Sequence, residues 1–375
     1  MTPAPTLTVQ KVRIDSWADD LRGPVALHLR QVLIPVEGKE GVIFPPTYAM
    51  KDDRKHGPYA TDELSDGTTV VQIDSVGSQA NRMEPLFRKA AEGRPENPLA
   101  ALVPQVEIQV ENGTAVSILD VGHRIGDALV RSSTLYKEVK AAFDAYRTRG
   151  DAAPIAKMAP TSIVFGAWDS RGEQAKLPRI VQSVVRAWNV EPLRRSAQYE
   201  PPVDYAALEV FSEEEKQKAE GDTKNLLAIR GFVHVPAVDT HGGVVARGGI
   251  FRDVTVNLVA LRQLDSKENG LALRRYILAL ALIAATEPQD GFLRQGCLLT
   301  PDPDSPSHWT LVERTGNRTT IGLSTEILRE YARAAAQAFG VGPDQNGTFS
   351  RDLAKADLGE SKKVKTKPQK EAAKN

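Results

Sequence analysis

Residues 70–82 (VVQIDSVGSQANR) run from a β-rich stretch directly into a helical one. Residues 70–74 are rich in β-branched side chains and predict a strand. The helical pattern continues over residues 79–91 and contains Pro85, which cannot donate a backbone hydrogen bond inside a helix. We therefore expect a strand-to-helix junction with a kink or a restart near Glu84.

The first turn of this helix carries side chains that suit phosphate binding. Ser78 and Arg82 are four residues apart and share one helix face, and exposed amides at a helix start attract phosphate oxygens. Gln79 and Asn81 can donate hydrogen bonds to sugar or phosphate groups. A capped helix with a solvated polar face explains the same residues, so both interpretations stay open.

The other elements follow in an irregular order that excludes strict βαβ alternation and an all-β fold. This order predicts an α+β protein with one antiparallel sheet, helices on one face and several insertions. Asn112-Gly113 between two β-rich stretches predicts a hairpin. The expected strands cover residues 25–35, 42–48, 106–110, 115–119, 162–168, 180–188, 226–235, 244–259 (around a glycine bend at 242–243), 296–300 and 308–313. The other expected helices cover residues 127–147, 270–286 and 324–339.

Charge is unevenly distributed along the chain. Lys+Arg and Asp+Glu are both 48, yet residues 360–375 hold six Lys against two Glu. A polyanionic partner must therefore be held by a local basic patch. We expect one core over residues 1–340, with excursions at 41–68 and 199–224, and a polar to basic, largely disordered tail over 341–375.

Several function classes lack their sequence signals. No nucleotide-binding glycine loop, zinc-protease motif or hydrolase elbow is present. The single cysteine, Cys297, lies in an apolar stretch, so we expect it to be buried and structural. We predict no metal, no cofactor, no signal peptide and no membrane span, and a cytoplasmic location in a reducing compartment.

A basic cluster covers residues 171–195, close to Trp168 and Trp188. Phosphates could pair with its cations while bases stack on the indoles, each stack contributing about 1–3 kcal/mol. Alternatively, both tryptophans belong to the core and the basic side chains are ordinary surface residues. The cations are Arg171, Lys176, Arg179, Arg186, Arg194 and Arg195, against two glutamates.

Residues 242–252 (GGVVARGGIFR) form a third basic element. Glycines let a backbone approach a ligand closely, and Arg247 and Arg252 could clamp phosphates. An ordinary hairpin with bulges explains the same stretch. Residues 230–235 (RGFVHV) are similar to the start of the RRM sheet motif but lack its second aromatic pair.

Four longer blocks resemble one family. Residues 41–49 (GVIFPPTYA), 73–85 (IDSVGSQANRMEP), 165–183 (FGAWDSRGEQAKLPRIVQS) and 248–264 (GGIFRDVTVNLVALRQL) resemble the CRISPR-associated RAMP-superfamily backbone subunit of Cascade, subtype I-G, formerly I-U. The similarity extends from about residue 25 to 340.

The resemblance implies a modified RRM, or ferredoxin-like, antiparallel palm with finger and thumb insertions, the thumb within 199–224. Copies would assemble head-to-tail along a CRISPR RNA (crRNA), hold its backbone and present its bases to target DNA. Other expected partners are the large subunit and the repeat-processing or capping subunit of Cascade. The subunit itself would be non-catalytic, since cutting of DNA falls to a separate helicase-nuclease.

The resemblance also implies guide contacts. Together with the basic cluster, the predicted RNA-binding residues are Ser78, Gln79, Asn81, Arg82, Arg171, Lys176, Arg179, Arg194, Arg195, Arg247 and Arg252. Two alternatives stay open. One is a metal-dependent ribonuclease of the same superfamily that uses Asp74, Asp169 or Asp253. The other is a protein-only scaffold whose basic patches bind an acidic partner.

Overall fold

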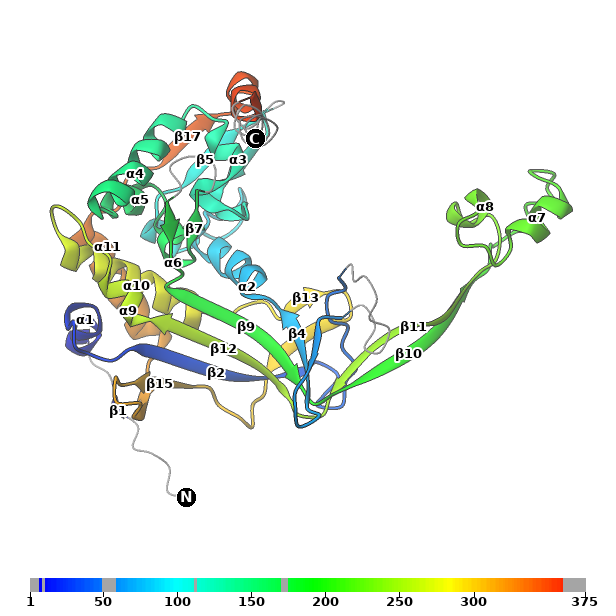
Figure 1. Cartoon of the computed structure of the whole chain (residues 1–375), viewed down its shortest axis with the longest axis horizontal. Helices are drawn as coiled ribbons and strands as arrows, with labels where there is room; N and C mark the ends of the chain where they lie inside the picture. The colour runs from blue at the N-terminus through cyan, green and yellow to red at the C-terminus, as the bar shows by residue number, and fades with distance from the viewer. Residues whose placement is uncertain (1–6, 9–10, 49–58, 111–112, 170–174, 360–375) are drawn as a thin grey trace, which may run out of the picture.

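The computed structural model describes residues 7–8, 11–48, 59–110, 113–169 and 175–359. They form an α+β fold with a curled, mainly antiparallel sheet, as the element order predicts (Figure 1). The sheet has ten strands, in the order β1-β16-β15-β2-β12-β9-β4-β3, with β13 and β14 off this path. Their bounds are β1 Leu7–Thr8, β2 Ala26–Pro35, β3 Thr61–Glu63, β4 Thr69–Asp74, β9 Val181–Trp188, β12 Ile250–Asn257, β13 Phe292–Arg294, β14 Cys297–Pro301, β15 His308–Val312 and β16 Arg318–Gly322.

The middle strand, β12, pairs antiparallel with β2 on one side and β9 on the other. Its side chains alternate between buried and half-buried, so Val254 and Val256 face the core while Asp253 and Thr255 face the other side. Only the short β1–β16 pair of this sheet is parallel in the described part of the chain. The strands predicted at 25–35, 70–74, 180–188, 296–300 and 308–313 are thus confirmed.

Helices pack on the inner face of this sheet. The most deeply buried is α10 (Gly270–Thr286), an apolar helix that contacts α11 (Thr325–Phe339), α1 (Lys11–Asp19) and α9 (Leu258–Arg262). Ser324 caps α11 as predicted, because its side chain accepts a hydrogen bond from the Ile327 amide. No helix in the described residues is long and apolar enough to cross a membrane.

A smaller, mostly helical layer lies beside these helices (Figure 1). The predicted hairpin forms between β5 (Val106–Gln109) and β6 (Ala115–Ser117), although residues 111–112 of its turn lie outside the described residues. β17 (Gln345–Thr348) pairs parallel with β5, so ordered structure continues beyond residue 340 into the predicted tail.

The single helix predicted over 127–147 is in fact two. The helices of this layer are α3 Ala128–Arg131, α4 Tyr136–Arg149, α5 Ala153–Met158 and α6 Pro160–Val164, with 3-10 turns η2 Ala100–Leu102, η4 Ile118–Asp120 and η5 Arg124–Gly126.

A long two-stranded ribbon extends the β9–β12 hairpin away from the body (Figure 1). Its strands are β10 (Val190–Tyr199) and β11 (Val235–Ala246). The ribbon ends in a small helical tip with α7 (Glu213–Ala219) and α8 (Leu226–Ile229), which has its own apolar cluster of Ala219, Ala228 and Val233. The segment 199–224, predicted to be an excursion, lies at the outer end of this ribbon and in its tip.

Three strand predictions are wrong. Residues 226–229 form α8, because Asn225 accepts a hydrogen bond from the Leu227 amide and caps a helix there. Residues 160–164 form α6, which begins at Pro160, a residue suited to the first turn of a helix. Residues 42–48 make only two isolated bridges, Ile43 with Val244 and Thr47 with Tyr59.

The predicted bend at 242–243 lies elsewhere. Both glycines are inside β11, and the chain turns at residues 247–249 instead. Gly243 has a φ of +93°, and a Cβ there would lie 2.7 Å from a Val42 methyl carbon. The glycine therefore serves the close approach of residues 42–44 to the ribbon base.

Candidate nucleic-acid interface

The junction between β4 and α2 (Val76–Met83) is a capped helix start. The Ser75 side chain accepts a hydrogen bond from the Ser78 amide at 3.1 Å, and the two hydroxyls lie 3.2 Å apart. The predicted interruption near Glu84 is confirmed, since α2 ends at Met83 and a 3-10 turn, η1 (Glu84–Phe87), follows. The capped-helix interpretation accounts for Ser78, which is half-buried.

Gln79 does not lie on an outer surface, contrary to its prediction as a guide contact. It is buried, and its amide nitrogen donates to Asp74 Oδ2 at 2.8 Å. Its amide oxygen accepts from Ser183 Oγ at 2.6 Å and from Arg252 Nε at 3.2 Å. Both ends of the amide are thus used to join α2 to β4, β9 and β12.

Arg82 is largely engaged in the same junction. Its Nε donates to Asp74 Oδ2 at 2.9 Å, and its Nη2 donates to the Leu293 carbonyl at 2.8 Å. Asn81, one residue earlier, is exposed and accepts a hydrogen bond from Arg124 Nη2 at 3.4 Å. Of the four predicted residues on α2, Asn81 is therefore the one most available to a ligand.

Two buried or half-buried guanidinium groups lie beneath Asn81. Arg124 pairs with Glu84 at 2.7 Å and donates to the Gly166 carbonyl at 3.2 Å. Arg179 donates to the Val76 carbonyl at 3.3 Å, and its pKa is lowered by burial and by the charge of Arg124. Burial also raises the pKa of Glu84 to about 7, so its negative charge is incomplete at neutral pH.

A short hairpin completes this surface. β7 (Ala167–Trp168) pairs with β8 (Lys176–Leu177), which puts Trp168 directly opposite Lys176. Trp168 is 62% exposed and Lys176 is exposed, so an indole face and a cation are presented together. Arg171 lies outside the described residues.

Close contacts hold the hairpin against Arg179 and the η5 turn. A Cβ at Gly166, whose φ is +78°, would lie 2.8 Å from Arg179 Cγ, and one at Gly126 would lie 3.3 Å from the Trp168 carbonyl. We call this surface the α2–hairpin patch. It consists of Asn81, Arg124, Trp168, Lys176 and Arg179. The sequence contained no spacing signal for Arg124, which is 43 residues from Asn81.

The two tryptophans of the basic cluster have different surroundings. Trp168 is exposed, as the stacking interpretation requires, whereas Trp188 is half-buried at the base of the ribbon. The Trp188 indole nitrogen is buried without a hydrogen-bond partner among the described residues. Each of the two alternatives drawn from the sequence therefore fits one tryptophan. Arg186 is half-buried on β9, with Phe251 of β12 opposite it in register.

Arg194 and Arg195 lie apart from the α2–hairpin patch, on β10. Arg194 donates to the Asp239 carbonyl at 3.3 Å. Arg195 lies over the Phe44 ring, 5.2 Å from its centre, in a pocket of about 490 Å³ that Arg294 and His241 also line. We call this the ribbon-base pocket, and Arg195 is the one of its residues that the sequence predicted to bind RNA.

Arg247 and Arg252 do not form the predicted phosphate clamp. Arg247, at the turn between β11 and β12, is held by the carboxylates of Glu191 and Glu40. Arg252 is 6% exposed and faces the inner side of the sheet, because it shares the buried face of β12 with Ile250 and Val254. The two side chains thus point to different environments.

The aspartates of the ribonuclease alternative are separated in the fold. Asp74 is buried and paired with Arg82 and Arg294, and Asp169 is buried as well. Asp253 lies 3.2 Å from His28 and 3.6 Å from Arg30, and the hydrogen bond from His28 is the main cause of its lowered pKa. The described residues contain no group of three or more His, Cys, Asp or Glu side chains placed to hold a metal ion.

Cys297 is buried, as predicted, and burial raises its pKa to about 11. A thiol with that pKa is almost entirely protonated at neutral pH, which fits a structural residue.

Comparisons with known proteins point to CRISPR systems. Residues 27–192 match the model of the family described as CRISPR-associated protein GSU0053 (Cas_GSU0053). No curated protein matches the chain. A chain of a solved structure, "CRISPR RNA-guided surveillance complex, pre-nicking", is similar at 13% identity and a TM-score of 0.33, over 84% of this chain and 88% of that one. A TM-score this low does not establish a shared fold. The part of this chain that carries α2 and the Trp168 hairpin is thus similar to a CRISPR-associated protein family.

Proposed function

We propose that this chain is a non-catalytic subunit of a type I CRISPR interference complex that binds the backbone of a guide RNA. Copies would assemble along the guide and leave its bases free to pair with target DNA. The observation that carries this proposal is the family match over residues 27–192, which includes the whole α2–hairpin patch. The finer assignment, a RAMP-superfamily backbone subunit of subtype I-G, rests on the four sequence blocks.

The α2–hairpin patch has the chemistry for this task. Lys176 and the guanidinium groups of Arg124 and Arg179 supply positive charge, and Trp168 supplies an exposed stacking face. Stacking and charge act on any base and any phosphate, so they bind RNA without reading its sequence. A subunit that repeats along one guide needs this kind of binding.

The strand order supports a ferredoxin-like palm. Strands β2, β9, β12 and β15 come in that order along the chain, with other strands between them, and they lie in the order β15-β2-β12-β9 with antiparallel neighbours. Helices connect β2 to β9 and β12 to β15. This is the split βαβ arrangement. We assign the ribbon and its tip, residues 190–246, as the thumb, which is longer than the segment 199–224 proposed from the sequence.

Assembly along a guide would be head-to-tail, an interface that does not close and so produces a filament. We propose further copies of the chain, a large subunit and a repeat-processing or capping subunit as partners.

The test is to express the chain with and without a CRISPR array and the partner subunits. The purified material is analysed by its 260/280 nm absorbance ratio, its mass and a denaturing gel of extracted nucleic acid. Discrete RNA of guide length in a large particle, found only with the array, supports the proposal. A particle free of nucleic acid in every condition overturns it and favours a protein-only scaffold.

A cleavage assay addresses the ribonuclease alternative. The RNA-bound particle is incubated with complementary target RNA and Mg²⁺ or Mn²⁺. Intact RNA is expected, and cleavage abolished by Asp253→Asn would contradict the non-catalytic assignment.

A further inference from the structure

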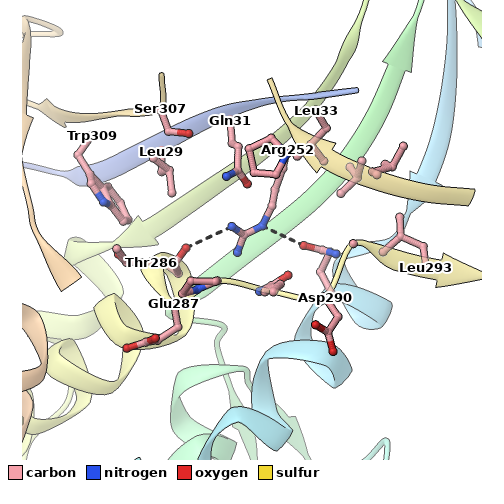
Figure 2. Close-up of a pocket in the computed structure, with 18 of the residues that line it drawn as sticks. Leu29, Gln31, Leu33, Arg252, Thr286, Glu287, Asp290, Leu293, Ser307 and Trp309 are labelled. Carbon is pink, nitrogen blue, oxygen red and sulfur yellow. Dashed lines mark hydrogen bonds between the residues drawn. The ribbon is translucent and has the colours of Figure 1, made fainter. Parts of the chain in front are cut away.

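A second cavity lies inside the body, where the inner face of the sheet meets the C-terminal end of α10 (Figure 2). Its volume is about 370 Å³, within the range of small-molecule sites. Aliphatic side chains from β2, β9 and β14 and the Trp309 ring form most of its wall. Its rim includes the exposed residues Pro288 and Ser307, so solvent reaches it.

Arg252 lies in this cavity without a counter-charge. Its Nε donates to Gln79 Oε1 and Ser183 Oγ, both at 3.2 Å, and its Nη1 donates to the Ala285 carbonyl at 3.3 Å. None of these acceptors is charged, and no carboxylate of the described residues forms an ion pair with it. The carboxylates of Glu287 and Asp290 point away from the guanidinium (Figure 2).

Burial makes this arrangement costly. It lowers the pKa of Arg252 to about 10, which still leaves the group charged at neutral pH. A buried ion carries a large desolvation penalty. The C-terminal end of α10 and the hydrogen bonds of Arg252 offset part of it. A role in packing alone could be filled by a neutral side chain at lower cost.

Further unused donors line the same cavity. The Thr286 hydroxyl and the Gln289 amide nitrogen are buried atoms with no hydrogen-bond partner among the described residues. Gln31 is opposite Arg252 in the β2–β12 register, and its amide points toward the guanidinium (Figure 2). These donors and the Arg252 cation suit a ligand that brings acceptor oxygens.

The type of anion follows from the charge of the walls. Among the described residues, Arg252 is the one cation that lines the cavity, and most of the lining is apolar. The Glu287 carboxylate is paired with Arg329, at 2.6 and 2.7 Å, so it adds little net charge, whereas Asp290 would repel a second negative charge. We propose that this cavity binds a monocarboxylate with a small branched apolar body, whose carboxylate pairs with Arg252. A phosphate dianion or a nucleic-acid strand fits these walls less well.

Isothermal titration calorimetry on the full chain tests the proposal. The probes are 4-methylpentanoate, its amide 4-methylpentanamide and inorganic phosphate. The acid should bind, the amide at least tenfold more weakly, and phosphate should not compete. Absence of acid binding, or equal affinity for acid and amide, would overturn the proposal.

Variants locate the binding. Arg252→Met should abolish acid binding, whereas Arg318→Gln, a matched loss of one exposed arginine on β16, should leave it unchanged. Unchanged acid affinity in Arg252→Met would refute the site. If Arg252→Met does not fold, Thr286→Val and Gln289→Leu are measured instead, and each should bind the acid severalfold more weakly because a donor to its carboxylate is lost. Wild-type affinity in both would equally refute it.

A last arm identifies the source of the carboxylate. The peptide acetyl-Gly-Gly-Leu is compared with a free C-terminus and as its amide. Binding of the free peptide at least tenfold tighter than 4-methylpentanoate indicates the C-terminus of a protein partner. Weaker binding indicates a free organic acid. Neither result depends on RNA, so failure here leaves the guide-binding proposal intact.

Discussion

Arg82 Nε and Asp74 Oδ2 lie 2.9 Å apart across the junction between β4 and α2, and Asp74 is only 1% exposed. Gln79 and Arg294 also donate to this carboxylate, at 2.8 and 3.4 Å. The four side chains fix how the sheet meets the helix that carries Asn81. Arg82 therefore serves the geometry of the site before it can serve as a ligand contact.

The first prediction concerns Arg82→Ala. Removing one partner of a buried carboxylate is destabilising, and two other donors and partial exposure of Arg82 reduce the effect to about 1–3 kcal/mol. Urea unfolding of the RNA-free chain measures it, with Lys176→Ala as a surface control expected to stay within about 0.5 kcal/mol. Wild-type stability together with lost RNA binding would instead make Arg82 a direct phosphate contact.

The second prediction concerns the exposed pair on the hairpin. Lys176→Ala should weaken RNA retention equally for guides of any sequence and lower the slope of log affinity against log salt by about 1. Lys137→Ala on α4, also an exposed lysine, is the matched control. Fluorescence anisotropy at four salt concentrations gives both quantities. A slope that stays at the wild-type value would place Lys176 outside the RNA path.

The third prediction concerns the indole itself. Trp168→Ala should cost about 1–3 kcal/mol in RNA binding without changing the salt slope, because stacking involves no counterion release. Trp168→Phe should recover part of the loss. If Trp168→Ala binds RNA as well as the wild type does, the exposed indole contacts a protein partner and not a base.

The alternation of side chains along β12 could have shown from the sequence that one predicted RNA-binding residue, Arg252, is buried. Ile250, Arg252, Val254 and Val256 share one face of the strand because the side-chain period is two. That pattern predicts a buried Arg252, whereas the motif-based view weighed only its charge. The strand-to-helix junction at 70–82 was predicted correctly because the strand pattern and the helix pattern each depend only on neighbouring residues in the sequence.

Other features depend on contacts far apart in the sequence. Arg124 reaches the patch through Glu84 and Gly166, and Arg247 meets Glu40 across 207 residues. Gly243 serves a contact with Val42 and not a turn. Such roles are set by tertiary packing, which local patterns do not encode.

The fourth prediction concerns the thumb. Replacing residues 200–234 with Asn-Gly joins Tyr199 to Val235, which are partners at the end of the ribbon, through a two-residue turn. The melting temperature should change by no more than about 2 °C, because the tip has its own apolar cluster, separate from the two larger ones. Co-purified RNA should remain while the particle loses mass, as measured by light scattering. A chain that no longer folds would show that the tip stabilises the body.

The last prediction concerns Glu84, beneath the α2–hairpin patch. Burial raises its pKa from an ordinary value of 4.5 to about 7. Below pH 4.5 the carboxyl is protonated in both states, so its contribution to stability is fully present. Between pH 4.5 and 7 the unfolded chain ionises first, and about 3 kcal/mol of stability is lost.

Glu84→Gln removes this titration, whereas Glu138→Gln, on the exposed face of α4, does not. Urea unfolding at pH 5 and pH 8 should show the wild type losing about 2–3 kcal/mol more than Glu84→Gln. Equal losses would mean that Arg124 keeps Glu84 ionised, and the positive charge of the patch would then come from Arg179 and Lys176.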